Sequence, residues 1–182
     1  MKRITVFGGS KPGEADYEQA LHLGKLLGQA GYTVITGGYY GTMEAVSRGA
    51  AENGAHVIGI TVGEMEAKRN VRANAWVQKE MSYPTLRQRL FALIEECDAA
   101  LALPGGPGTL AEIAEMWNHI LTGSISPRPL ILIGAGWQAV FETLFREFGG
   151  YMPEEPRRWL QYAANIDEAV DHLKAWSSGP AH

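Results

Sequence analysis

Short apolar runs rich in β-branched residues alternate with longer helix-like segments, and this alternation restricts the fold more than any other feature. Continuous apolar strands separated by helices are typical of parallel sheets that helices cover on both faces. The sequence therefore predicts an α/β, Rossmann-like, doubly wound sheet, mainly parallel, with six to seven strands. Strands are expected at residues 4–7, 32–36, 56–60, 75–80, 99–103 and 129–133, with a short edge strand at 161–166.

Helices are expected where apolar residues recur every three to four positions. These segments are 15–31, 41–54, 85–97, 109–121, 136–149 and 167–176. A chain of 182 residues is long enough for one domain and short for two, so residues 1–182 are expected to form a single domain. The polar segment 63–74 is predicted to be a mobile loop.

Charge and composition exclude several classes of function. The net charge is -4 with no long basic run, which argues against nucleic-acid binding through a broad basic face. Cys97 is the single cysteine, so an intrachain disulfide and a cysteine-rich zinc site are both excluded. The five histidines lack metal-ligand spacing, and no metal or cofactor is expected. The apolar run at 4–7 is too short for a leader or a membrane span, which predicts a cytoplasmic protein without membrane contact.

Three glycine-rich loops follow predicted strands, at residues 8–13, 37–42 and 105–109. In doubly wound sheets, ligands bind outside the carboxyl ends of the strands, where these loops lie. Glycines let a backbone approach an anion, and a helix start offers free N–H groups and partial positive charge. The alternative is a set of tight turns without a ligand. The candidate phosphate-binding residues are Gly8, Gly9, Ser10, Gly37, Gly38, Gly41, Gly105, Gly106, Gly108 and Thr109.

Two common nucleotide-binding motifs are missing. No Gly-Lys-Ser/Thr phosphate loop occurs, and "GGSKPG" after the first strand lacks the spacing of a dinucleotide-binding turn. A nucleoside triphosphatase and a standard dehydrogenase are therefore disfavoured.

The polar and charged residues beside the third loop can each be explained by a structural role or by a functional one. Thr109 and Glu112 fit a capping box, with Thr109 as the N-cap and Glu112 at the third helical position, which needs no catalysis. The same spacing places the Glu112 carboxylate one turn from a bound phosphate, near a sugar. Arg87 and Arg89 lie on the preceding helix, where a guanidinium suits a phosphate or an anionic leaving group, although a solvated helix face accounts equally well for one of them.

Taken together, the loops resemble those of a known family. "PGGPGTLAE" (104–112) matches the signature PGGxGTxxE of the LONELY GUY family, and "VFGGSKPG" (6–13) and "TGGYYGTMEAVSRGA" (36–50) resemble its first and second loops. The similarity spans roughly residues 4–129. Members of that family are cytokinin riboside 5′-monophosphate phosphoribohydrolases, formerly labelled lysine decarboxylases. Molybdenum-cofactor carrier proteins form a related branch with a similar fold and loop.

The resemblance implies hydrolysis of the N-glycosidic bond of a nucleoside 5′-monophosphate, giving free base and ribose 5-phosphate. The implied catalytic pair is Arg89, from the family's Met-His-x-Arg-Lys motif, and Glu112. This chain reads Leu-Arg-Gln-Arg-Leu at 86–90, has Gly-Gly-Tyr where the second loop has three glycines, and has Gly-Gly-Ser-Lys for Cys-Gly-Ser-Ser. These departures fall around the substrate and leave the phosphate loop and the acid intact.

Other interpretations stay open. One is a carrier that binds a nucleotide or a phosphorylated pterin-type cofactor without cleaving it, and another is a structural dimer with an inactive site. A homodimer, or a higher oligomer, is expected because the family pairs through the segment around 115–130, where Trp117, Ile120 and Leu121 are apolar for a free surface.

Overall fold

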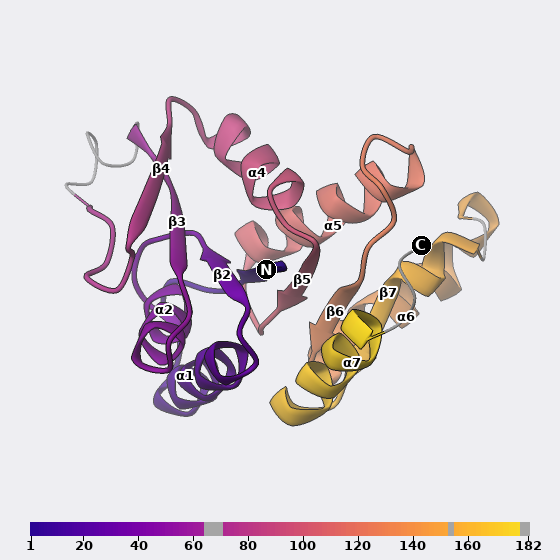
Figure 1. Ribbon diagram of the computed structural model, residues 1–182. Helices are drawn as coiled ribbons and strands as arrows, with labels where there is room; N and C mark the ends of the chain where they lie inside the picture. The colour runs from indigo at the N-terminus through magenta and orange to yellow at the C-terminus, as the bar shows by residue number, and fades with distance from the viewer. Residues whose placement is uncertain (64–70, 153–154, 179–182) are drawn as a thin grey trace.

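A single sheet of parallel strands organises the chain (Figure 1). The structure is a computed structural model that describes residues 1–63, 71–152 and 155–178. Within them the strand order is β4-β3-β2-β1-β5-β6-β7, and every pair is parallel. The predicted doubly wound α/β fold is confirmed. The strands are β1 (Arg3–Phe7), β2 (Thr33–Thr36), β3 (Val57–Val62), β4 (Lys79–Tyr83), β5 (Ala99–Ala102), β6 (Leu130–Ile133) and β7 (Leu160–Ala163).

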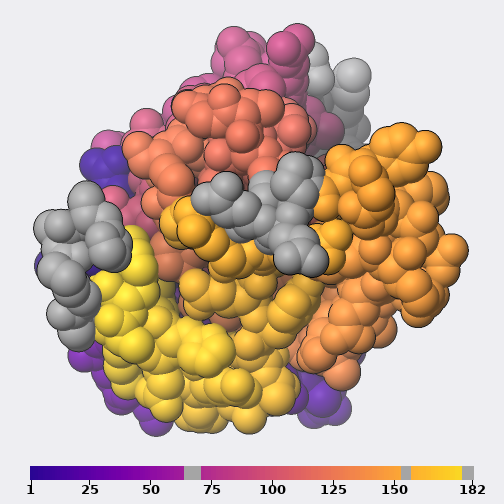
Figure 2. Space-filling model, turned by 90° about the vertical axis from the view of Figure 1, so that its right-hand side faces the viewer, coloured from indigo at the N-terminus to yellow at the C-terminus, as the bar shows by residue number. Residues whose placement is uncertain are grey.

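Helices cover both faces of the sheet, as predicted. One face packs against α1 (Glu14–Gln29), α2 (Thr42–Glu52) and α7 (Ile166–Ser178). The other packs against α4 (Leu86–Glu95), α5 (Pro107–Leu121) and α6 (Ala135–Phe148). Two short 3-10 helices, η1 (Gly149–Tyr151) and η2 (Glu155–Trp159), lie between α6 and β7. On the β7 side, α7 in yellow and the residues around α6 and η1 in orange form much of the surface (Figure 2).

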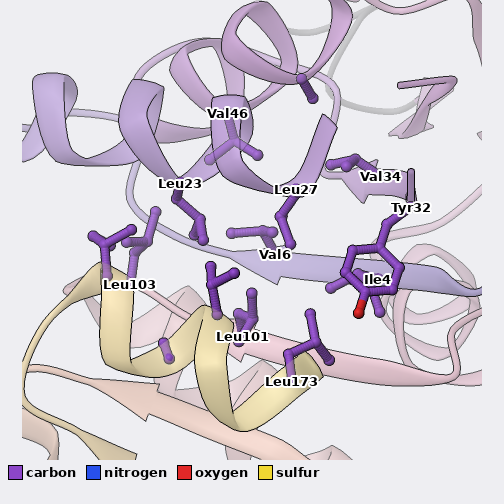
Figure 3. Packing of buried hydrophobic residues seen from close by; sticks show 14 of the residues in the cluster. Ile4, Val6, Leu23, Leu27, Tyr32, Val34, Val46, Leu101, Leu103 and Leu173 are labelled. Carbon is purple, nitrogen blue, oxygen red and sulfur yellow. The ribbon is translucent and has the colours of Figure 1, made fainter. Parts of the chain in front are cut away.

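Strand alternation divides the core between the two faces. Val6 of β1 and Leu101 of β5 point into one cluster, where they lie between Leu23 of α1 and Leu173 of α7 (Figure 3). Each such fully buried side chain contributes about 2 kcal/mol. On the opposite face β5 presents small alanines to α5. β1 pairs with both β2 and β5, so the direction of winding reverses between β1 and β5. Their carboxyl ends therefore border the crevice where ligands bind in such folds.

Three glycines bring α1 and α2 into unusually close contact. A Cβ on Gly24 would lie 2.9 Å from the Ala50 amide nitrogen, and one on Gly28 would lie 2.8 Å from the Ala50 carbonyl oxygen. A Cβ on Gly49 would lie 2.8 Å from the Lys25 amide nitrogen. Small residues at these positions let the two backbones touch. This contact fixes α2, whose first turn belongs to the second glycine loop.

Two strand predictions were displaced. The fourth strand begins at Lys79 rather than residue 75, because the Val77 amide donates to the Asn74 carbonyl in a turn and Val77 packs on Gly59. The last strand ends at Ala163, and Ile166 already belongs to α7. Of the predicted mobile loop at 63–74, residues 64–70 lie outside the described residues. None of the helices in the described ranges is long and apolar enough to cross a membrane.

Candidate functional site

The third glycine loop connects β5 to α5 at the carboxyl edge of the sheet. Gly106 is the N-cap of α5 in an extended conformation, and Pro107 takes the first helical position. Proline suits that position because its fixed φ is helical and the N–H it lacks would be unpaired there. No side chain caps this helix start. Gly106 and Gly108 are exposed and open space surrounds them, so the loop presents its backbone to solvent.

The predicted capping box at α5 is wrong. Because Pro107 starts the helix, Thr109 is already its third residue and Glu112 lies in the second turn. Thr109 is 2% exposed, and its side chain lies against Gly105. A Cβ added to Gly105 would overlap the Thr109 hydroxyl. A hydroxyl contact from Thr109 to a phosphate stays a prediction. With the cap excluded, Glu112 has no local role at the helix start.

The first glycine loop is joined to the start of α2. Thr42 donates to the Gly9 carbonyl oxygen through both its amide and its hydroxyl, each at 3.0 Å. A Cβ on Gly8 would overlap the Thr42 side chain, and one on Gly9 would lie 3.7 Å from the Gly105 Cα. The first and third loops therefore touch across the β1–β5 crevice. Ser10 is exposed at the edge of this contact.

The second loop lies deeper and supports Arg89. Gly37 and Gly38 are buried, and a Cβ on Gly37 would overlap the Arg89 guanidinium. Gly38 and Gly41 have φ of +77° and +75°, which glycine adopts without strain. Gly41 packs its Cα against the Ser10 backbone, where a Cβ would lie 2.6 Å from the Ser10 carbonyl carbon. Direct phosphate contacts from Gly37 and Gly38 stay a prediction, since Arg89 occupies the space beside Gly37, and Thr61 and Gly59 occupy that beside Gly38.

Arg89 and Glu112 come together from two different helices. Arg89 Nη1 lies 3.8 Å from Glu112 Oε1, and the two side chains are only 10% and 13% exposed. Arg89 follows a threonine N-cap at Thr85, which accepts from the Gln88 amide and donates to the Gln88 side chain. α4 thus has a threonine N-cap with its bond to the N3 amide, which the sequence suggested for α5, and the N3 side chain here bonds to the cap hydroxyl. Arg87 is exposed and lies over the Phe91 ring, so the solvated-face interpretation holds for Arg87.

Burial dominates the electrostatics of this pair. It raises the pKa of Glu112 to about 7, although the Arg89 charge acts to lower it. Burial also lowers the pKa of the Arg89 guanidinium, against the opposing charge of Glu112. A carboxylate that titrates near neutrality, beside a cation and next to a backbone-lined loop, is suited to exchange a proton at physiological pH.

The sequence predicted a helix after the sixth strand, but the start of that helix was not among the candidate site residues. Gly134, with φ of +96°, is the N-cap of α6, and no side chain caps that helix either. Beside it lies an open, largely apolar hollow of about 250 Å³ that reaches the third glycine loop. Trp137 donates its indole N–H to the Leu103 carbonyl at 3.0 Å and so fixes the end of β5. The signal was the run "LILIGAG" at 130–136, which repeats the strand-then-glycine pattern. The residues that line the hollow are Pro104, Gly105, Ile133, Gly136, Trp137 and Val140.

One argument for dimerisation changes with the structure. Trp117 and Ile120 are 7% and 5% exposed within a single chain, because they pack in the core between α5 and α6. Trp117 meets Phe141 edge to face, with ring centres 6.0 Å apart. Leu121, at 41% exposure, is the member of the predicted surface that is open. Dimerisation stays a prediction, which light scattering at micromolar concentration would check.

Comparison with known proteins places this chain in a family. A model described as the SLOG cluster4 family matches residues 1–134. A probable cytokinin riboside 5′-monophosphate phosphoribohydrolase of Oryza sativa, LOGL5, is 34% identical over 118 residues, and the match covers 63% of this chain but 47% of the rice protein. The cytokinin riboside 5′-monophosphate phosphoribohydrolase LOG2 of Arabidopsis thaliana is 31% identical, with 96% of this chain and 84% of that protein covered.

Solved structures agree on the fold. The molybdenum cofactor binding protein from Rippkaea orientalis is 23% identical, with a TM-score of 0.76 over 97% of this chain and 98% of the other. The chain therefore belongs to the SLOG cluster4 family, and the predicted kinship with the LONELY GUY proteins is confirmed.

Proposed function

We propose that the protein hydrolyses the N-glycosidic bond of a nucleoside 5′-monophosphate. The observation that carries this proposal is the buried Arg89–Glu112 pair, which lies beside an uncapped, backbone-lined helix start. The names of the two plant relatives support it, because both describe phosphoribohydrolases of a nucleoside monophosphate.

The 5′-phosphate would bind at the start of α5. Gly106 and Gly108 leave room for an anion, and the free amides and partial positive charge of the helix start favour it. Binding energy from this remote group would hold the ribose in position for reaction. A substrate without the phosphate should therefore lose turnover as well as affinity.

Glu112 and Arg89 would then act on the sugar and the base. The bond between C1′ and the base nitrogen breaks, and positive charge develops on the ribose as in other glycoside hydrolyses. The Glu112 carboxylate stabilises that charge and accepts a proton from the attacking water, whose oxygen bonds to C1′. The departing base takes the electron pair of the broken bond and gains a proton from solvent, and Glu112 releases the proton taken from water back to solvent. Arg89 assists its departure or holds the nucleotide.

The test is incubation with a panel of purine and pyrimidine nucleoside monophosphates, including N6-substituted adenine forms, with chromatography of the products. Free base and ribose 5-phosphate are expected in equal amounts, and the matching nucleosides serve as controls for the phosphate. Glu112→Gln and Arg89→Ala should each lower kcat by about 100-fold or more. Turnover that survives Glu112→Gln at the wild-type rate would contradict the assignment.

A second candidate is a carrier that binds a nucleotide or a phosphorylated pterin-type cofactor without cleaving it. The hollow of about 250 Å³ beside the glycine loop favours it, because its apolar lining suits a flat ligand anchored by a phosphate. The likeness to the Rippkaea orientalis protein concerns the fold alone. Tight binding without product would support the carrier, and no binding of any phosphorylated ligand would exclude both functions.

A further inference from the structure

Two nitrogens of the Arg89 guanidinium group bind backbone carbonyls, and the third faces Glu112. Its Nε donates to the Ile60 carbonyl of β3 at 2.8 Å, and its Nη2 donates to the Gly37 carbonyl at 3.2 Å. Nη1 is the nitrogen that faces Glu112. The direction of Nη1 therefore depends on where the second glycine loop places its carbonyl groups.

Tyr39 locks that loop to the end of β3. Its hydroxyl donates to the Val62 carbonyl at 3.2 Å and accepts from the Val62 amide at 2.8 Å. The side chain is buried, and the Arg89 Cζ lies 5.7 Å from the centre of its ring. A guanidinium at this distance from an aromatic face is attracted by the ring quadrupole. Tyr39 therefore contacts both the guanidinium and the strand that carries one of its acceptors.

Asn74 holds the same loop from the other side. Its amide and its side-chain Nδ2 donate to the Gly38 carbonyl at 2.8 and 3.0 Å, and Nδ2 also donates to the Tyr39 carbonyl at 2.8 Å. Its Oδ1 accepts from the Trp76 amide at 3.1 Å. Asn74 is only 6% exposed, so removal of its side chain would take the Nδ2 donor away from the Gly38 and Tyr39 carbonyls in a buried setting and leave Gly38 with the Asn74 amide.

The geometry points to Tyr39 and Asn74 as positioning residues for Arg89, which fix the carbonyl acceptors and the ring face that aim Nη1 at Glu112. This inference rests on the proposed function for its kinetic consequence and not for its geometry. Tyr39 contacts Arg89 through its ring, and Asn74 holds the carbonyl groups of the loop that binds Arg89, so each acts on Glu112 through Arg89 as a positioning residue.

Two variants separate the ring from the hydroxyl. Tyr39→Leu removes the ring face and the hydroxyl, whereas Tyr39→Phe keeps the ring and removes the bonds to Val62. Asn74→Ala removes the side-chain bonds to the Gly38 and Tyr39 carbonyls and keeps the backbone bond to Gly38. Tyr39→Leu and Asn74→Ala should lower kcat by about 10- to 100-fold with KM changed by less than about threefold, because misplaced catalytic groups cost mainly rate. Tyr39→Phe should fall between them and the wild type. The matched control is Tyr32→Leu, which removes another buried tyrosine whose hydroxyl donates to Ser177.

A measurement without substrate keeps this test independent of the proposed function. Carbon-13 NMR of the Glu112 carboxyl group follows its titration, and Arg89 is the charged group that acts on it among the described residues. The titration midpoint should rise in Tyr39→Leu and Asn74→Ala, because a displaced Arg89 no longer lowers the pKa of Glu112. It should not move in Tyr32→Leu.

The outcomes are separable. A folded Tyr39→Leu with wild-type kcat and an unchanged Glu112 midpoint would overturn the positioning role. If the wild type cleaves no nucleotide, the proposed function fails, and the NMR midpoint alone still decides the positioning role. Should Tyr39→Leu fail to fold, Asn74→Ala and Tyr39→Phe provide the same comparison.

Discussion

Replacing Glu112 by glutamine should change how the stability of the protein depends on pH. In the folded chain burial raises the pKa of this carboxyl from its ordinary 4.5 to about 7. At a pH between these two pKa values, Glu112 holds a proton in the folded state that it has released in the unfolded state. Stability is therefore highest below pH 4.5 for this group and falls as pH rises through the folded pKa of about 7. The gap between the two values corresponds to about 3 kcal/mol.

Glutamine keeps the shape of the neutral acid and does not titrate, so it removes this loss. Urea unfolding at pH 5, 6, 7 and 8 should show that the free energy of unfolding of Glu112→Gln rises relative to that of the wild type by up to about 3 kcal/mol across that range. The control is Glu18→Gln, which removes an exposed carboxylate from α1. Wild-type and Glu112→Gln curves that stay parallel from pH 5 to pH 8 would refute the reasoning, because Glu112 would then titrate alike in both states.

Two further perturbations test the glycines. Gly24→Ala places a Cβ against the backbone of α2 and should cost about 1–3 kcal/mol of unfolding free energy. Gly136→Ala in α6 meets open space and should be neutral or slightly stabilising. Thermal melting of both variants checks this, and equal melting points would contradict the packing argument. In the third loop, the methyl group of Gly105→Ala collides with Thr109 and should destabilise the fold. Gly106→Ala has room and should leave the melting point unchanged. If the phosphate binds against Gly106, this variant should raise KM for a nucleoside monophosphate by about tenfold, which steady-state kinetics would measure.

The architecture was predictable because its signals are local. Alternating apolar runs and helical periodicity persist through the chain, and glycine marks the strand-to-helix turns. The fourth strand was misplaced for a tertiary reason. Val77 is apolar because it packs on Gly59 of the neighbouring strand, and the Asn74 turn keeps it out of β4. An apolar run alone does not distinguish a strand from a segment that packs beside one.

The site was predictable only in part. The pairing of Arg89 with Glu112 followed from a family resemblance, and the structure brings both side chains within 3.8 Å. Their catalytic roles stay a prediction. Tyr39 and Asn74 were not found because the bond of Tyr39 to Val62 spans 23 positions and that of Asn74 to Gly38 spans 36, and no local pattern records such contacts. The capping box failed because Pro107 takes the first helical position, so the N-cap is Gly106, three residues before Thr109.

The geometry of the buried pair itself favours hydrolysis over simple binding. A structural ion pair gains most from close, bidentate hydrogen bonds. Here Arg89 gives Nε and Nη2 to backbone carbonyls and meets Glu112 through Nη1 at 3.8 Å, which leaves the carboxylate weakly compensated and its pKa near 7. A positive charge that develops on a ribose next to Glu112 would compensate it better than Arg89 does, so the interaction would be strongest in the transition state. A carrier has no such charge to stabilise. Glu112→Gln should therefore abolish turnover and preserve nucleotide binding in a hydrolase, and should leave a carrier's binding and cargo unaltered.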